Sequence, residues 1–352
     1  MTSQHPRRSL FPLLCLVFVL LFGLQPAHAV KVDKLYEAFA PVSSRAAQQR
    51  PAALREVLRR VVVKVSGQNV LPGGFASGVR MDTLTEQFGY ESRQVPGHEG
   101  LHLWARLNAA RVNRLIRDAG LPIWPVERPA TLLWVAIQDK TEEVLGEDST
   151  HEVMAGIDAL AAQRGIPLIY PIMDLAESSQ VDYGKVARLD AALLSSASEK
   201  YASQYQLIGH IQRLSKKKWR ARWRILDGNS ADSQPVITTP AGPLSDVLAA
   251  AINPLASIIA QQFSSFSRLD GAQYIDITLD DVNGAADYVR SLKYLESLSP
   301  VSKVDVLSVD GKQVNFRLHT HVDMASLLQV ISLGRVLYAR DAIDRLVFGL
   351  NP

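Results

Sequence analysis

Two pairs of histidines stand at spacings that could hold a metal ion. The run HEGLH, from His98 to His102, matches the HExxH pattern, in which both histidines bind zinc and the glutamate acts as a base. That chemistry needs a helix, because a helix brings residues four apart onto one face. Gly100 and the alternating run LHLWARL predict a strand instead, where residues four apart are separated by about 13 Å. We therefore interpret HEGLH as a chance match.

The second pair, His319 and His321, alternates along a predicted strand, so both imidazoles belong to one face of that strand. Two histidines make half of a typical metal site, and the sequence identifies no third or fourth ligand. Histidines packed on the surface of a sheet are the favoured explanation of the pattern. We therefore expect no bound metal and no other cofactor, and we retain His319 and His321 as the candidate ligands should a metal bind.

Motifs for nucleophilic catalysis or phosphate binding are incomplete. The run GFASG, at 74–78, places Ser77 one position later than the G-x-S-x-G pattern requires. It also lacks the lysine of a phosphate-binding loop. The one cysteine, Cys15, lies in an apolar N-terminal run. We therefore assign no catalytic residue and favour a protein that is not an enzyme, with a metal-dependent hydrolase as an alternative.

The stretch KKKWRARWR, at 216–224, combines six cations with two tryptophans. On a strand, alternation places the tryptophans on one face and Lys218, Arg220, Arg222 and Arg224 on the other. A groove that stacks nucleic-acid bases needs aromatic and basic side chains on the same surface. We therefore predict buried tryptophans and a basic sheet face, whose four cations could contact an acidic protein or the phosphate headgroups of a membrane.

The N-terminus has the pattern of a secretory signal peptide. Arg7 and Arg8 precede an apolar run of 15 residues, and Ala27-His28-Ala29 supplies the small residues of a cleavage site. The run is shorter than the roughly 20 residues of a membrane span. We predict cleavage after Ala29 and a periplasmic protein, the alternative being an uncleaved anchor. The mature chain would then contain no cysteine and no transmembrane segment.

The charge balance does not favour a nucleic-acid partner. The chain holds 38 Lys+Arg against 35 Asp+Glu, and the predicted signal peptide removes two arginines and no acid, which leaves 36 against 35. A net charge this close to zero does not attract a polyanion over a distance. The hydrophobic content of 47% is that of globular domains with buried cores.

The elements that must position these residues fall into three blocks, in which strand and helix patterns alternate. The proline-rich linker LPIWPVERP separates the first block from the second. We predict a multi-domain protein of the α+β or mixed α/β class, in which two small βαββα domains flank a mixed-sheet βαβαββα domain. The predicted boundaries are 1–29 for the signal peptide and 30–126, 127–266 and 270–352 for the domains.

Local signals predict several individual elements. Pro51 and Gly67 bracket a helical stripe of apolar residues, with a change from helix to strand near Val61 as the alternative. The run GIPLIYPIMD, at 165–174, is predicted to be a strand. The last helix of the second block is predicted to kink or split at Pro254, because proline lacks the amide hydrogen that a helix interior uses.

Several motifs carry a resemblance to a known family. They are RPAALREVL followed by VSG at 65–67, GLPIW at 120–124, RPATLLWV at 128–135 and GIPLIYPIMDL at 165–175. Together they resemble the domain-of-unknown-function 2066 family (DUF2066) of exported Gram-negative bacterial proteins, over most of residues 31–265. The resemblance implies an envelope location and no catalytic residues. The second block is also similar in topology to the N-terminal domain of the translocation protein TolB and to activator lipoproteins of penicillin-binding proteins, a likeness of fold alone.

These observations favour a non-catalytic adaptor or assembly factor of the cell envelope, which binds another envelope protein. An alternative is a binder of anionic lipid or envelope polymer through residues 216–224, with peripheral contact to an anionic membrane surface.

Overall fold

The computed structural model describes residues 29–75, 77–95, 98–228, 235–264, 273–320, 322–334, 336–340 and 346–351. The predicted signal peptide up to residue 28 lies outside these residues, and so does His321. Cleavage after Ala29 and the periplasmic location therefore stay predictions.

The N-terminal part, residues 29–126, is a three-stranded antiparallel sheet with helices packed on it. The strand order is β2-β4-β3, and the short strand β1 pairs with β5 of the following part. The elements are β1 (Ala29–Lys31), β2 (Glu37–Pro41), α2 (Arg50–Ser66), α3 (Met81–Leu84), β3 (Thr85–Val95), β4 (His98–Leu107) and α4 (Ala109–Asp118).

Helix α2 follows its local signals closely. Pro51 lies in the first turn, and Gly67 ends the helix at a φ of 72°, a left-handed conformation that glycine adopts without strain. Val61 and Val62 are fully buried on its inner side. The alternative of a strand from Val61 is therefore wrong, because burying the apolar stripe outweighs the weak helix propensity of valine.

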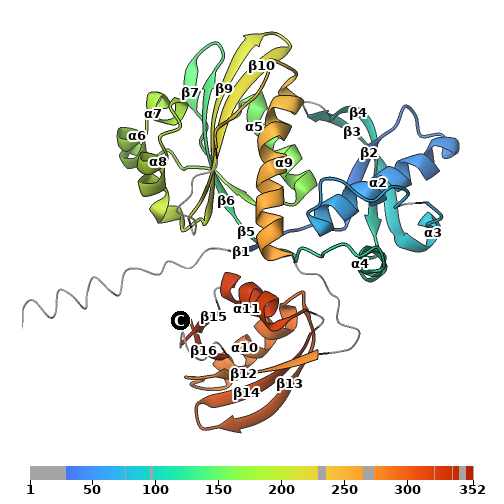
Figure 1. Ribbon diagram of the computed structural model, residues 1–352, viewed down its shortest axis with the longest axis vertical. Coiled ribbons are helices and arrows are strands. Elements are labelled where there is room, and N and C mark those ends of the chain that lie inside the picture. Colours follow the sequence, from blue (N-terminus) through green and yellow to red (C-terminus); the bar gives the residue numbers. More distant parts are fainter. Residues whose placement is uncertain are drawn as a thin grey trace, which may run out of the picture.

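The central part, residues 127–264, has a mixed sheet between two sets of helices (Figure 1). The strand order is β11-β10-β9-β6-β7, and β8 also pairs with β6. Helices α5 and α9 cover one face, while α6, α7 and α8 lie on the other. The elements are β5 (Glu127–Pro129), β6 (Thr131–Gln138), β7 (Glu142–Val144), α5 (Glu152–Arg164), β8 (Leu168–Ile169), α6 (Leu175–Gln180), α7 (Tyr183–Ala187), α8 (Ala191–Ser198), β9 (Tyr205–Ser215), β10 (Lys218–Asp227), β11 (Ile237–Thr238) and α9 (Leu244–Phe263).

Two central elements differ from their predictions. The run at 165–174 forms only the two-residue strand β8, because Pro167 and Pro171 have no amide hydrogen for a sheet. Helix α9 is continuous across Pro254 and does not split. Both halves of α9 bury apolar residues in the same core. This packing stabilises the helix although Pro254 cannot donate a backbone hydrogen bond.

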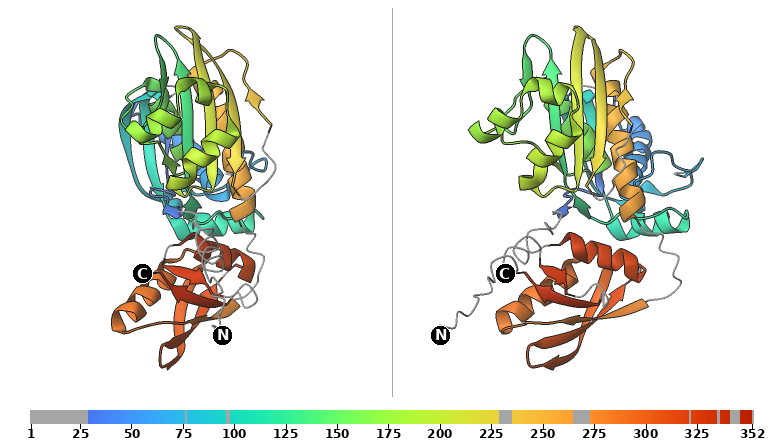
Figure 2. Two further views of the ribbon diagram at one scale, coloured as in Figure 1. Left: turned by 90° about the vertical axis from the view of Figure 1, so that its left-hand side faces the viewer. Right: turned by 60° about the vertical axis from the view of Figure 1, so that its left-hand side comes forward.

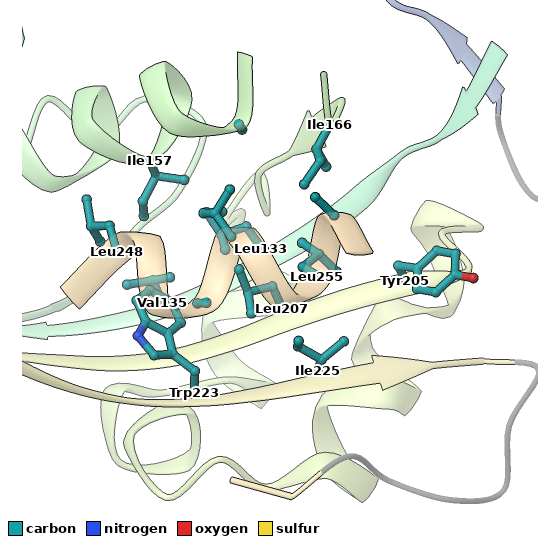
Figure 3. Close-up of a cluster of buried hydrophobic side chains, with 14 of the residues drawn as sticks. Leu133, Val135, Ile157, Ile166, Tyr205, Leu207, Trp223, Ile225, Leu248 and Leu255 are labelled. Carbon is teal, nitrogen blue, oxygen red and sulfur yellow. The ribbon is translucent and has the colours of Figure 1, made fainter. Parts of the chain in front are cut away.

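The central core lies between the sheet and helices α5 and α9 (Figure 3). Side chains of three adjacent strands point toward α9, and they include Leu133, Val135, Leu207, Trp223 and Ile225. Among the described residues, α9 is the helix whose length and composition would allow it to cross a membrane. Its buried face in this core accounts for that composition.

The C-terminal part, residues 273–351, has a five-stranded sheet of order β13-β14-β12-β16-β15. In both flanking parts the third strand lies between the first and the second, so the two parts share one antiparallel strand order. This architecture confirms the predicted α+β class, although β15 and β16 were not predicted. The elements are β12 (Gln273–Leu279), α10 (Ala285–Ser297), β13 (Val301–Asp310), β14 (Gln313–Thr320), α11 (Met324–Leu333), β15 (Leu337–Ala339) and β16 (Val347–Leu350).

The three parts touch one another (Figure 2). The end of α2 lies against α9, where a Cβ placed on Gly67 would come within 2.2 Å of the Cβ of Ala260. The C-terminal part contacts the central part at two places. Ser299 donates a hydrogen bond to Glu127 at 2.8 Å, and Leu333 of α11 packs in the central core. The exact domain boundaries stay a prediction.

Trp223 of β10 is packed directly over Gly209, its partner on β9. A Cβ on Gly209 would lie 2.2 Å from the indole ring, and the indole Nε1 donates to the carbonyl of Val247 in α9 at 3.2 Å. The absence of a side chain at 209 therefore makes room for the buried tryptophan.

We expect Gly209→Ala to lower the free energy of unfolding by about 1–3 kcal/mol, because Trp223 must move within a close-packed core. Chemical denaturation followed by tryptophan fluorescence measures this loss. The matched control is Gly242→Ala, since a Cβ there meets no atom within 4 Å. Equal losses for the two variants would contradict this account of the packing.

Candidate functional site

Arg128 is fully buried where the N-terminal and central parts meet. Its guanidinium lies over the indole of Trp124, 3.6 Å from the ring centroid. It donates hydrogen bonds of 2.8 to 3.4 Å to five backbone carbonyl oxygens, those of Lys64, Trp124, Pro125, Arg164 and Gly165. One side chain therefore connects α2, α5 and the segment that links the two parts.

The carbonyls of Lys64 and Arg164 belong to the last turns of α2 and α5. Helix C-termini carry the negative end of the helix dipole, so these groups partly offset the buried positive charge. Desolvation by burial lowers the pKa of Arg128, yet a guanidinium that acts only as a donor stays protonated. Gly165 ends α5 at a φ of 68°, and a Cβ there would lie 2.3 Å from Nη1 of Arg128.

Two more cations are buried beside Arg128. The ammonium of Lys64 donates to the carbonyls of Glu37 at 2.8 Å and Lys34 at 3.3 Å. Arg164 donates to the carbonyl of Gly67, the residue that ends α2, at 3.0 Å. Desolvation, followed by the charge of Arg128, lowers the pKa of Lys64 to about 8, although the Glu37 carboxylate opposes this shift. Desolvation lowers the pKa of Arg164 to about 10.

A cavity of about 330 Å³ opens beside Lys64, between the N-terminal and central parts. We call it the β2 cavity, because strand β2 forms one of its walls. The other walls come from the segment that follows β1, from α2, and from the C-terminal end of α5 with the residues after it. Its apolar lining includes Val30, Val32, Ala38, Phe39, Ala159, Ala162, Ile166 and Pro167.

The charged lining of the β2 cavity is mostly basic. The lining contains five cationic and two anionic side chains, which gives a formal net charge of +3. The cations are Lys31, Lys34, Arg60, Lys64 and Arg93, and the acids are Asp33 and Glu37. Arg93 lies over the ring of Phe39, 4.0 Å from its centroid. His102 also lines the cavity, and its Nδ1 donates to the carbonyl of Gly100 at 3.0 Å. This arrangement is suited to binding an anion.

The HEGLH run lies in strand β4, so the predicted strand conformation is confirmed, and the helix that the zinc motif requires does not form. The strand separates His98 and His102 along its length. Within the described part of the chain, no group of three or more histidine, cysteine or acidic side chains is placed to hold a metal ion.

His319 takes part in a cross-strand contact with a carboxylate. Its Nε2 lies 2.7 Å from Oδ2 of Asp305 on β13, and Lys303 contacts the other oxygen of that carboxylate at 2.7 Å. Hydrogen bonds from Lys303 and then His319 lower the pKa of Asp305. The second candidate ligand, His321, lies outside the described residues, so the metal hypothesis for this pair stays a prediction.

Burial alternates along β10, where Trp219 and Trp223 are buried and Lys218 and Arg220 are exposed. The two tryptophans therefore belong to the core, and the cations point to the opposite face. Lys218 and Arg220 lie close to the turn that joins β9 to β10.

The remaining two cations of this face make further contacts or are partly buried. Arg222 donates a 2.7 Å hydrogen bond to the carbonyl of Ala187 at the end of α7. The Nε atom of Arg224 is buried. Lys218, Arg220 and Arg222 are exposed, and Arg224 is partly buried. The hypothesis of an anionic partner at Lys218, Arg220, Arg222 and Arg224 stays a prediction.

The outer edge of the C-terminal sheet is a further candidate surface for binding. Strand β13 pairs with β14 on one side only, and we call its other side the β13 edge. Apolar side chains are exposed on this strand: Val306 at 39%, Leu307 at 45% and Val309 at 61%. Sequence reasoning did not identify this strand as an edge.

Sequence reasoning also missed Lys64 and Arg128. A signal for Lys64 was present in the sequence, because Lys64 falls on the same helical stripe as Val57 and Val61. A charged residue on an apolar stripe is expected to face the core together with that stripe. Arg128 had no comparable signal, since its acceptors come from α2 and α5, far away in the sequence.

Comparison with known proteins assigns no activity. Residues 29–125 match a family described as a domain of unknown function (DUF8605). The match ends before Arg128 and covers the N-terminal part alone, so the chain is similar to this family over that part. Among curated proteins, no match was found.

The resemblance to the domain-of-unknown-function 2066 family is wrong, since the matching family is DUF8605. The short motifs behind that resemblance are explained by structure: a proline in the first turn of α2, a glycine at its end and a buried strand β6. The expected envelope location therefore depends on the predicted signal peptide alone.

We expect Arg128→Met to lower the free energy of unfolding by about 3 kcal/mol or more, because buried carbonyl groups lose their donor. Urea denaturation measures the change. Arg220→Met is the matched control on the exposed face of β10 and should change stability by no more than about 0.5 kcal/mol. Similar losses for the two variants would show that Arg128 does not connect the two parts.

Lys64 predicts a specific dependence of stability on pH. Its pKa is about 8 in the folded protein against 10.5 for the free side chain, so the folded state binds fewer protons between these values and stability rises with pH across this window. Relative to Lys64→Met, the wild type should gain up to about 3 kcal/mol between pH 8 and 10.5. Denaturation of both proteins across this range measures the difference, and a constant difference would contradict the shifted pKa.

Proposed function

We propose that this chain is an exported, non-catalytic adaptor of the cell envelope, which binds another envelope protein through the β13 edge. The single observation that carries the proposal is a ten-residue edge strand with three exposed apolar side chains. A free strand edge offers a row of backbone donors and acceptors to an incoming strand.

The exposed residues support a partner of defined chemistry. Among the described residues no strand pairs with this edge, so Val306, Leu307 and Val309 would be an aggregation hazard there. A partner segment that adds as a further strand would satisfy the edge backbone and shield these side chains at once. The expected partner is therefore an extended, largely apolar segment of another protein.

The neighbouring polar face supports recognition through the edge. Arg317 and Asp276 form a two-pronged ion pair at 2.8 and 2.7 Å, and Lys303 pairs with Asp305. These charges already neutralise one another, so the outward face of the sheet has little free charge for a partner. Backbone pairing and apolar contact along β13 are left as the main sources of affinity.

The test is site-specific photocrosslinking in intact cells that produce the protein. A photoreactive residue in place of Val309 should form one discrete adduct with a different protein. Adding Leu307→Lys should reduce that adduct about tenfold or more, because a charge on the edge opposes strand addition.

The controls use an exposed valine away from the edge. Val289 in α10 is 43% exposed, so a photoreactive residue there should form no such adduct, and Val289→Lys should leave the Val309 adduct intact. An adduct with twice the mass of the chain would identify a second copy as the occupant. That result, or an adduct that persists with Leu307→Lys, would overturn the proposal.

A further inference from the structure

The β2 cavity has the size and composition of a small-molecule site. Its volume of 330 Å³ lies near the lower end of the roughly 300–1,000 Å³ typical of such sites. Phe39, Ile166 and Pro167 supply apolar walls, and basic side chains surround them. The lining of the cavity includes no residue of β13, so this inference does not rest on the adaptor proposal.

Among the described residues, no carboxylate contacts the buried ammonium of Lys64 directly. Its side chain lines the cavity, and the residue is only 6% exposed. The ammonium has three hydrogens, and two of them are used by the carbonyls of Glu37 and Lys34. A buried ammonium is unfavourable unless an anion or further hydrogen bonds compensate for the lost water. Nearby Arg128 adds repulsion, which an anion would reduce.

The other lining charges agree with an anionic ligand. Arg60 is held by Glu56 at 2.6 Å, and Arg93 is held over Phe39, so both guanidinium groups have defined positions. Of the two carboxylates in the lining, Glu37 already contacts Lys34 and Arg106. Because Glu56 and Glu91 partly offset the charges of Arg60 and Arg93, Lys64 is the main buried cation that an incoming anion meets.

We propose that the β2 cavity binds an anionic amphiphile, an alkyl chain that ends in a carboxylate. The carboxylate accepts a hydrogen bond from Lys64, and the alkyl chain packs against Phe39, Ile166 and Pro167. Removing the alkyl chain from water supplies most of the affinity, and Lys64 selects the anionic headgroup. A neutral amphiphile of the same length lacks the second contribution and binds more weakly.

The test is isothermal titration calorimetry of the full chain with decanoate and with decanol, both below their aggregation concentrations. Decanoate should bind at least about tenfold more tightly than decanol, and each CH₂ removed from the chain should weaken binding by up to about fourfold. Lys64→Met should remove the preference for decanoate and leave the affinity for decanol unchanged.

Two further variants make the result decisive. Ala162→Trp, at an exposed position of α5 that lines the cavity, should abolish binding of both ligands by filling the site. Arg220→Met, on the distant face of β10, should change neither affinity. The proposal is overturned if the folded wild-type chain does not bind decanoate. It is also overturned if decanol binds as tightly as decanoate, or if Ala162→Trp leaves both affinities unchanged.

Discussion

The buried guanidinium of Arg128 holds the ends of two helices from different parts of the chain. Its acceptors are all backbone carbonyls, two of which belong to the last turns of α2 and α5. Both helices end in a glycine with a left-handed φ, and a side chain at either glycine would collide with what lies next to it. The fully buried charge is tolerated because helix dipoles and the indole of Trp124 surround it. The junction is therefore built from backbone geometry as much as from apolar contact.

The β2 cavity is a consequence of this junction. Lys64 belongs to the last turn of α2, whose carbonyl Arg128 binds, and its ammonium turns toward the edge of β2. The end of α5 is held in place by the same guanidinium and forms another wall. Arg128 thus positions the two helices that contribute Lys64 and the apolar wall of the cavity. The β13 edge is separate, since it depends only on the order of strands in the C-terminal sheet.

Prediction from sequence succeeded where a local pattern sufficed. The apolar stripe and the two end signals of α2 and the alternation in β10 each describe contacts with one neighbouring layer. It failed for residues 165–174, where an apolar run made a two-residue strand, and for β15 and β16, which are too short to show a period. It did not reveal the hydrogen bond from Arg222 of β10 to the carbonyl of Ala187 in α7, because the two residues lie 35 positions apart in the chain.

By itself, the sequence determined the class of fold, the core positions of the two tryptophans in KKKWRARWR and the strand conformation of HEGLH, since period and end signals act over a few residues. The tertiary structure decided which charges are buried, which strand is an edge and where a cavity remains. These properties depend on elements that are distant in the chain and adjacent in space. Arg128 illustrates the division: its sequence neighbours predict a linker, and only the meeting of α2 with α5 shows what its charge binds.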